Sequence, residues 1–98
     1  MYNSRLKDPR IDRLFDAVLT LQNHDDCYRF FEDLCTVAEL KSLAQRMQVA
    51  EMLYQEQSYN AIAEKSGAST ATISRVKKCV NYGADGYKLV IQKMIKEK

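Results

Sequence analysis

The segment from Ser58 to Val80 constrains the fold of this 98-residue chain more than any other stretch. Its first half carries Ile62 and Ala63 on one side of a short helical run, and Gly67 follows four residues after Ala63. A small residue such as Ala63 lets a second helix cross closely, and Gly67 allows the positive φ that a β-carbon resists. The spacing therefore predicts two short helices joined by a tight turn, a helix-turn-helix.

The second half of this segment has one apolar face and one polar face. Ile73 and Val76 recur at helical spacing and would anchor the second helix, which either Ser69 or Thr70 can cap. The outward positions carry small residues first and cations later: Thr70, Ala71, Ser74, Lys77 and Lys78. This order suits a helix pushed end-on into a major groove. A structural hairpin inside a core is the alternative, but the outward face lacks the large apolar residues that a buried helix would show.

The candidate DNA contacts can be sorted by their chemistry. Hydroxyls at the start of the second helix suit phosphates or base edges, the later lysines suit phosphates, and Arg75 is the one candidate for a bidentate guanine contact. Without Asn or Gln on this face, specificity would rest partly on water bridges and DNA shape. The predicted contact residues are Asn60, Ser69, Thr70, Ala71, Thr72, Ser74, Arg75, Lys77 and Lys78.

The small net charge of +2 hides a segregation along the chain. Residues 11–57 carry nine acids and four bases, whereas residues 64–98 carry eight bases and three acids. A basic C-terminal part attracts phosphates, and the acidic part repels them. The charge pattern therefore favours a nucleic-acid partner on the side of the helix-turn-helix.

The composition favours a single all-α domain over residues 1–98, with residues 1–7 as a flexible arm. Pro9 is the sole proline, glycine occurs three times, and strand-like alternation is missing. Without a signal sequence or a membrane-length apolar run, we expect a cytoplasmic protein that contacts no membrane. The three cysteines lack metal-ligand spacing, so we expect no metal site. With one histidine, no Gly-rich loop and no paired carboxylates in a plausible cleft, we expect no enzyme.

Six helices are expected in total. Asp8 and Pro9 should start the first, which should end near Asn23–His24, and Asp25 or Asp26 should cap the second. A capping box from Thr36 to Glu39 should start the longest helix, which runs to about Tyr54. The helix-turn-helix over 58–80 follows, then a turn over 82–86 and a final amphipathic helix.

The apolar residues of these helices exceed what a compact monomer of this size readily buries. The central helix is apolar around more than half of its circumference, which indicates contacts from several sides. We therefore expect a homodimer that shares the first, second, third and sixth helices. Its two helix-turn-helix motifs, about 34 Å apart, could bind a two-fold symmetric site.

The run GASTATISR (67–75), the stretch LAQRMQVAEML with Arg46, and the six-helix order together resemble the bacterial Trp repressor superfamily. The chain is most similar to the YerC/YecD-type branch of Trp repressor-like proteins. The resemblance implies an intertwined all-helical homodimer and a sequence-specific transcriptional regulator, a repressor, that reads operator DNA with the second helix of its motif. The alternative is a helix-turn-helix module that binds a protein partner without sequence-specific DNA binding.

The resemblance also implies a place for a small-molecule effector, since the founding member of the family binds tryptophan. Arg46 and Arg75 match the arginines that would sandwich the indole; without a ligand, Arg75 could contact a phosphate and Arg46 could pair with an acid across the dimer. Val76 replaces a glycine that admits the ring, and Cys79 replaces a serine that meets the amino group. We therefore expect no tryptophan cofactor. The residues of this possible effector pocket are Thr36, Arg46, Thr72, Arg75, Val76 and Cys79.

Overall fold

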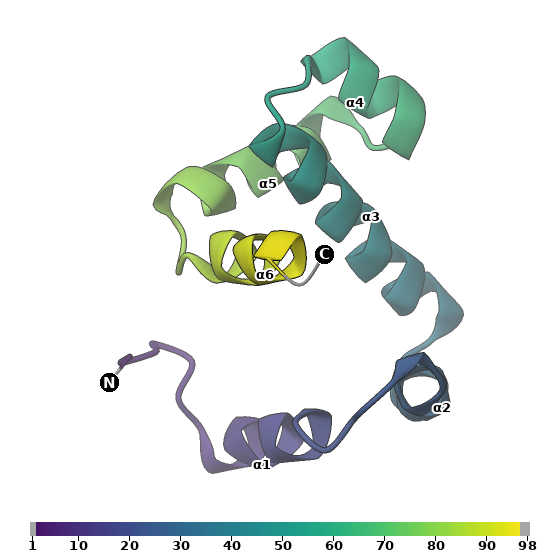
Figure 1. Cartoon of the computed structure of the whole chain (residues 1–98), viewed down its shortest axis with the longest axis vertical. Helices are drawn as coiled ribbons and strands as arrows, with labels where there is room; N and C mark the ends of the chain where they lie inside the picture. The colour runs from purple at the N-terminus through teal and green to yellow at the C-terminus, as the bar shows by residue number, and fades with distance from the viewer. Residues whose placement is uncertain (1, 97–98) are drawn as a thin grey trace. The chain divides into compact units, whose positions relative to one another are not determined.

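The computed structural model describes residues 2–96, and this range contains six α-helices and no strand (Figure 1). The helices are α1 (Pro9–Val18), α2 (His24–Leu34), α3 (Val37–Tyr54), α4 (Tyr59–Ser66), α5 (Thr70–Tyr82) and α6 (Gly86–Lys96). The chain divides into two compact units, Met1–Thr36 with α1 and α2, and Val37–Lys98 with α3 to α6. The predicted all-α class and the number of helices are thus confirmed within the described range.

The start of α1 follows the sequence prediction. The Asp8 carboxylate accepts hydrogen bonds from the backbone N–H groups of Arg10 at 2.7 Å and Ile11 at 3.4 Å. Pro9 occupies the first turn, where its missing N–H costs no hydrogen bond. Before the helix, residues 4–7 form a turn closed by the Lys7 N–H on the Ser4 carbonyl. The N-terminal cap was therefore predicted correctly.

The end of α1 and the start of α2 differ from the prediction. Helix α1 ends at Val18, because Thr20 donates its N–H and its hydroxyl to the Ala17 carbonyl and Leu21 donates to that of Val18. Asn23 then caps α2 by accepting the Asp26 N–H at 2.8 Å. The expected end near Asn23–His24 and the expected Asp25 or Asp26 cap were wrong: Asn23 lies in extended backbone before α2, and His24 begins that helix.

The second unit is built around the C-terminal half of α3. Nine buried residues form its core: Val49, Ala50, Met52, Ile62, Ala68, Ile73, Val76, Val80 and Ile91. Helices α4, α5 and α6 all pack against α3, and α5 also packs against α4 and α6 (Figure 1). Helix α3 starts directly after Thr36 and ends at Tyr54, as predicted. However, its buried residues lie only between 49 and 52, and Val37 near its start is 72% exposed.

A short turn between Tyr82 and Gly86 leads from α5 into α6, as the sequence predicted. Gly83 is required there because a β-carbon would overlap the Cys79 carbonyl group. The positive φ of this turn, 64°, falls on Asp85 and not on a glycine. The turn places Ile91 of α6 in the core of the second unit.

Candidate nucleic-acid interface

Helices α4 and α5 form the predicted helix-turn-helix. Ser58 caps α4 by accepting the Ala61 N–H at 3.2 Å. Helix α4 ends at Ser66 and is followed by its C-cap Gly67, whose φ is 71° and whose N–H donates to the Ala63 carbonyl at 2.9 Å. Ser69 then caps α5 by accepting the Thr72 N–H at 3.1 Å. Of the two caps that the sequence allowed, Ser69 is therefore the one used, and Thr70 is the first residue of α5.

Two polar side chains that the sequence analysis did not single out hold the turn of this motif. The Ser66 hydroxyl donates to the Ile62 carbonyl at 2.6 Å and accepts the Ala68 N–H at 3.1 Å. From α3, the Gln45 amide donates to the Ser66 carbonyl at 3.1 Å. These bonds connect the end of α4 to both the turn and the central helix. The serine immediately before the turn glycine was the available sequence signal, whereas Gln45 lies 21 residues from its partner.

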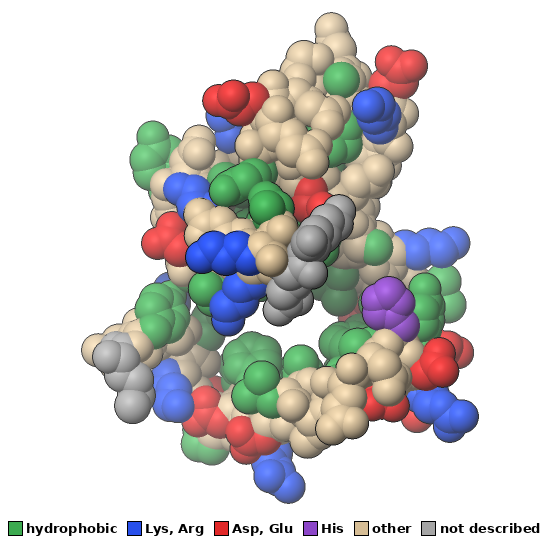
Figure 2. Space-filling model, in the orientation of Figure 1, with side chains coloured by type: hydrophobic (Ala, Val, Ile, Leu, Met, Phe, Trp, Pro, Cys, Tyr) green, Lys and Arg blue, Asp and Glu red, His purple; other side chains and the backbone are tan. Residues whose placement is uncertain are grey.

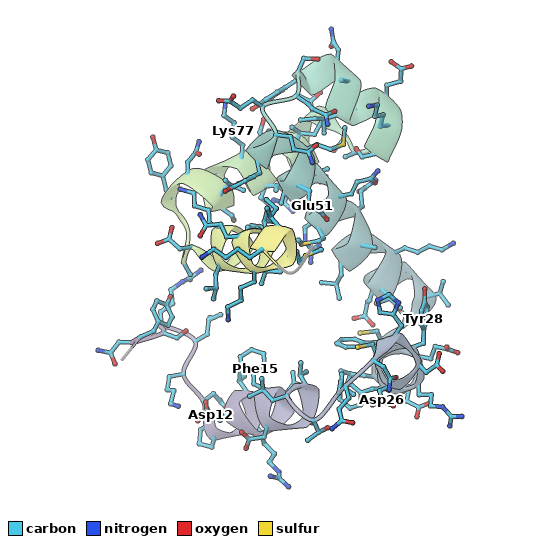
Figure 3. The ribbon with its side chains drawn as sticks, in the orientation of Figure 1. Asp12, Phe15, Asp26, Tyr28, Glu51 and Lys77 are labelled. Carbon is cyan, nitrogen blue, oxygen red and sulfur yellow. The ribbon has the colours of Figure 1, made fainter. Side chains whose placement is uncertain are left out.

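The outward face of α5 is exposed as predicted. Thr72 is half-buried, and its hydroxyl accepts a hydrogen bond from the Ser69 hydroxyl at 3.1 Å, so these two residues support each other at the start of the helix. Lys77 is labelled in Figure 3. The exposed predicted contacts are Asn60 on α4, Ser69 before α5, and Thr70, Ala71, Ser74, Arg75, Lys77 and Lys78 on α5. The structure thus gathers small hydroxyls at one end of an accessible helix and cations beyond them, while their contacts with DNA stay a prediction.

The residues of the predicted effector pocket have different environments. Val76 is 1% exposed and belongs to the core of the second unit, whereas Cys79 and Arg75 are exposed. Arg46 is half-buried on α3 and donates to the Ser42 hydroxyl at 2.9 Å. Thr36 is the last residue of the first unit. The interior position of Val76 agrees with its expected role as a core anchor, and the ligand role of the set stays a prediction.

The first unit exposes much of its apolar surface. None of the described residues of α1 or α2 is buried. Phe15 is 56% exposed, Leu19 82% and Tyr28 63%. Figure 2 shows apolar side chains at the surface of this segment beside acidic ones, and Figure 3 labels Phe15 and Tyr28 on separate helices. The exposed large apolar residues 14, 15, 19, 28 and 34, together called the apolar face below, lie outside the interior of their own unit.

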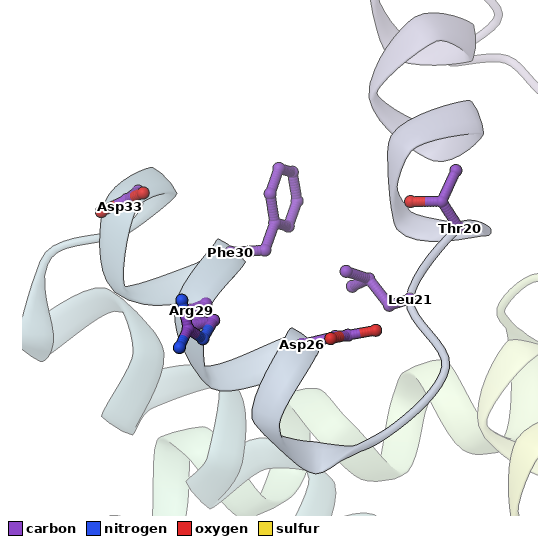
Figure 4. A pocket seen from close by; sticks show the side chains of 6 residues that line it. All are labelled: Thr20, Leu21, Asp26, Arg29, Phe30 and Asp33. Carbon is purple, nitrogen blue, oxygen red and sulfur yellow. The ribbon is translucent and has the colours of Figure 1, made fainter.

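A shallow groove of about 320 Å³ lies on the same unit (Figure 4). The Asp26 carboxylate on its wall accepts the Gln22 N–H at 3.1 Å and so holds the connection between α1 and α2. The groove is lined by Thr20, Leu21, Asp26, Arg29, Phe30 and Asp33.

The fold and the α4–α5 motif define a helix-turn-helix protein with an exposed, partly cationic second helix. Comparison with protein families makes the assignment specific. The family model described as Trp repressor protein matches residues 9–95, and the chain belongs to this family. Within residues 2–96, no helix combines the length and the apolar character needed to cross a bilayer.

Individual relatives agree with this assignment. The chain is 48% identical over 94 residues to the uncharacterized protein YerC of Bacillus subtilis, covering 96% of this chain and 90% of YerC. A crystal structure from Staphylococcus aureus, proposed to be a Trp repressor, matches with a TM-score of 0.88 and 52% identity, covering 92% of this chain and 90% of that one. A TrpR-like protein from Eubacterium eligens matches with a TM-score of 0.89 and 51% identity, covering 94% and 95% of the two chains. The expected resemblance is thus confirmed.

Proposed function

We propose that this chain is a cytoplasmic, sequence-specific DNA-binding transcriptional regulator that acts as a repressor through α5. The observation that carries the proposal is the exposed face of α5, where small side chains at the capped N-terminus precede Arg75, Lys77 and Lys78. A rigid turn supports this helix, since Gly67, Ser66 and Gln45 fix the end of α4. Short hydroxyl side chains let the helix backbone approach base edges closely, and the cations reach the flanking phosphates.

The proposed active form is a homodimer. The apolar face of the first unit and the exposed Val37 and Leu43 of α3 would be covered by a second copy of the chain. Large exposed apolar side chains in this number support an interface with another protein. A two-fold dimer presents two copies of α5, which suits an operator with two-fold symmetry.

We infer further that tryptophan is not the effector of this regulator. Val76 occupies the position that must be a glycine for the indole to approach, and its side chain packs within the core of the second unit. Cys79 offers only a weak acceptor where an ammonium would need a strong one. The effector, where one exists, would be a different small molecule.

The function is tested by selecting random DNA duplexes with the purified full-length protein and measuring the binding of enriched duplexes across a salt series. A two-fold symmetric motif with half-sites about one helical turn apart is expected. Continued failure to enrich a motif, with and without added amino acids and other metabolites, would favour the alternative of a protein-binding module.

The salt series also tests the role of individual cations. Lys78→Gln should weaken binding and lower the slope of log affinity against log salt by about 0.9 for each phosphate that the variant no longer neutralises. Arg13→Gln is the matched control, because it removes one positive charge from α1 and leaves α5 intact. An unchanged slope in Lys78→Gln would show that this lysine binds no phosphate.

A further inference from the structure

Lys77 and Tyr59 form a contact that joins the two helices of the motif. The Lys77 Nζ atom lies 5.3 Å from the centroid of the Tyr59 ring, within the range of a cation–π interaction. Tyr59 is the first residue of α4, and Lys77 lies in the middle of α5. Because Lys77 follows the buried Ile73 by four residues, its side chain leaves α5 at the margin of the buried face. The contact therefore lies where α5 borders α4.

Among the described residues, no acidic side chain lies within ion-pair distance of Lys77. The neighbouring Lys78 is also exposed, but no aromatic ring of residues 2–96 lies over its ammonium group. A free lysine side chain samples many rotamers and loses that freedom when it binds a phosphate. The two adjacent lysines therefore differ before DNA binds, because only the Lys77 ammonium group is in contact with an aromatic ring.

The backbone that carries Tyr59 is held in place. Ser58 caps the first turn of α4, and Ile62, three residues after Tyr59, is fully buried against the core. The Tyr59 side chain is 37% exposed, so it stays accessible at the surface of the motif. It therefore leaves a helix turn that is capped and anchored in the core, whereas Lys77 has a long, flexible stem.

We propose that Tyr59 is a positioning residue, whose ring holds the Lys77 ammonium group ready to bind a DNA phosphate beside the groove that α5 enters. This inference rests on the proposed DNA-binding function. Contact with a ring face occupies one side of an ammonium group and leaves N–H donors directed to solvent. Tyr59 then acts on DNA affinity through Lys77 and makes no base contact.

The first test requires no DNA. In the full-length wild-type protein, the NMR signals of the Lys77 ε-methylene should be shifted upfield by the ring current of Tyr59. Tyr59→Phe should keep the shift and Tyr59→Leu should abolish it, with circular dichroism showing that both variants fold. Unshifted Lys77 signals in the wild-type protein would overturn the proposal.

The second test measures affinity for a duplex selected by the wild-type protein. Tyr59→Phe should bind like wild type, and Tyr59→Leu should weaken binding about two- to fivefold for each motif that contacts DNA. Lys77→Gln should weaken binding at least as much, and adding Tyr59→Leu to it should weaken binding no further. The matched change Lys78→Gln should leave the effect of Tyr59→Leu intact.

Two results would overturn the positioning role while leaving the proposed function standing. In the first, Tyr59→Leu weakens binding equally with and without Lys77, which would place Tyr59 itself on the DNA or in the support of the fold. In the second, Tyr59→Leu binds as tightly as wild type. If wild type binds no duplex, the proposed function and the positioning role both fail, although the NMR shift still shows whether the pair exists.

Discussion

Single side-chain oxygens decide where several helices of this protein begin. Asp8, Asn23 and Ser69 each accept a backbone N–H group from the first turn that follows. Asp8 could be predicted because a proline comes next, and a cap at either Ser69 or Thr70 could be predicted because a glycine turn precedes both. Asn23 could not, since Leu19 and Leu21 continue the apolar stripe of α1 and hide its end. A helix cap can thus be predicted from neighbouring residues when the apolar repeat of the preceding helix does not continue past that helix's end.

Gly67 should be sensitive to substitution because of its backbone conformation. Gly67→Ala places a β-carbon on a backbone with φ of 71°, which should cost about 1–2 kcal/mol in the free energy of unfolding. Urea denaturation monitored by circular dichroism measures this cost. Gly86→Ala is the control, because its β-carbon would meet open space at the start of α6 and should leave stability nearly unchanged. Equal effects of the two changes would contradict the argument from φ.

Val76, again a single residue, gives a prediction for the binding of tryptophan. Titration calorimetry of the wild-type protein with L-tryptophan should show no saturable heat up to millimolar concentrations, because Val76 is a buried core residue and, by the family resemblance, replaces the glycine that would admit the ring. Saturable binding at millimolar or lower concentration would refute this expectation. An amino acid without an aromatic ring serves as the reference titration.

At the scale of the element, α3 is divided along its length. Its buried residues Val49, Ala50 and Met52 enter the core with α4, α5 and α6, whereas Val37 and Leu43 are exposed. The sequence predicted that α3 is apolar around most of its circumference, and its extent was correct. The sequence alone could not show that the burial is confined to one end, because that depends on which helices pack there.

The cap of α2 gives a prediction for how a single helix start contributes to the stability of the protein. Asn23→Ala should lower the free energy of unfolding by about 1 kcal/mol, because the Asp26 N–H loses its partner at the helix start. Asp25→Asn is the control, since it changes only a charge in the first turn. The expected order of midpoints in urea is wild type close to Asp25→Asn, with Asn23→Ala clearly lower. An Asn23→Ala midpoint equal to that of wild type would contradict the Asn23 cap.

At the scale of the whole molecule, the apolar residues of α1 and α2 are the main feature left without a partner inside their unit. The helix-turn-helix, its turn glycine and its exposed cations could be predicted, because each depends on residues close in sequence. The supports from Gln45 and Tyr59 could not, since each lies far along the chain from its partner. The expected single domain and the DNA contacts stay predictions.

The apolar face gives the prediction for assembly. Phe15→Gln should shift the protein from dimer towards monomer in sedimentation equilibrium, because it replaces an exposed apolar ring by an amide that would be buried in the proposed interface. Arg13→Gln, two residues away on α1, introduces the same side chain and should leave the assembly unchanged. A wild-type protein that sediments as a monomer would contradict the proposed dimer.

Dimerisation through the exposed apolar face would also make regulation depend steeply on the amount of protein that the cell synthesises. When two chains must meet before either can bind an operator, the amount of active regulator rises with the square of chain concentration while most chains are monomeric. Halving the expression of such a regulator would then remove about three quarters of its active form under dilute conditions. A surface of a few exposed leucines and aromatic rings would thus convert a gradual change in protein synthesis into a sharper change in operator occupancy.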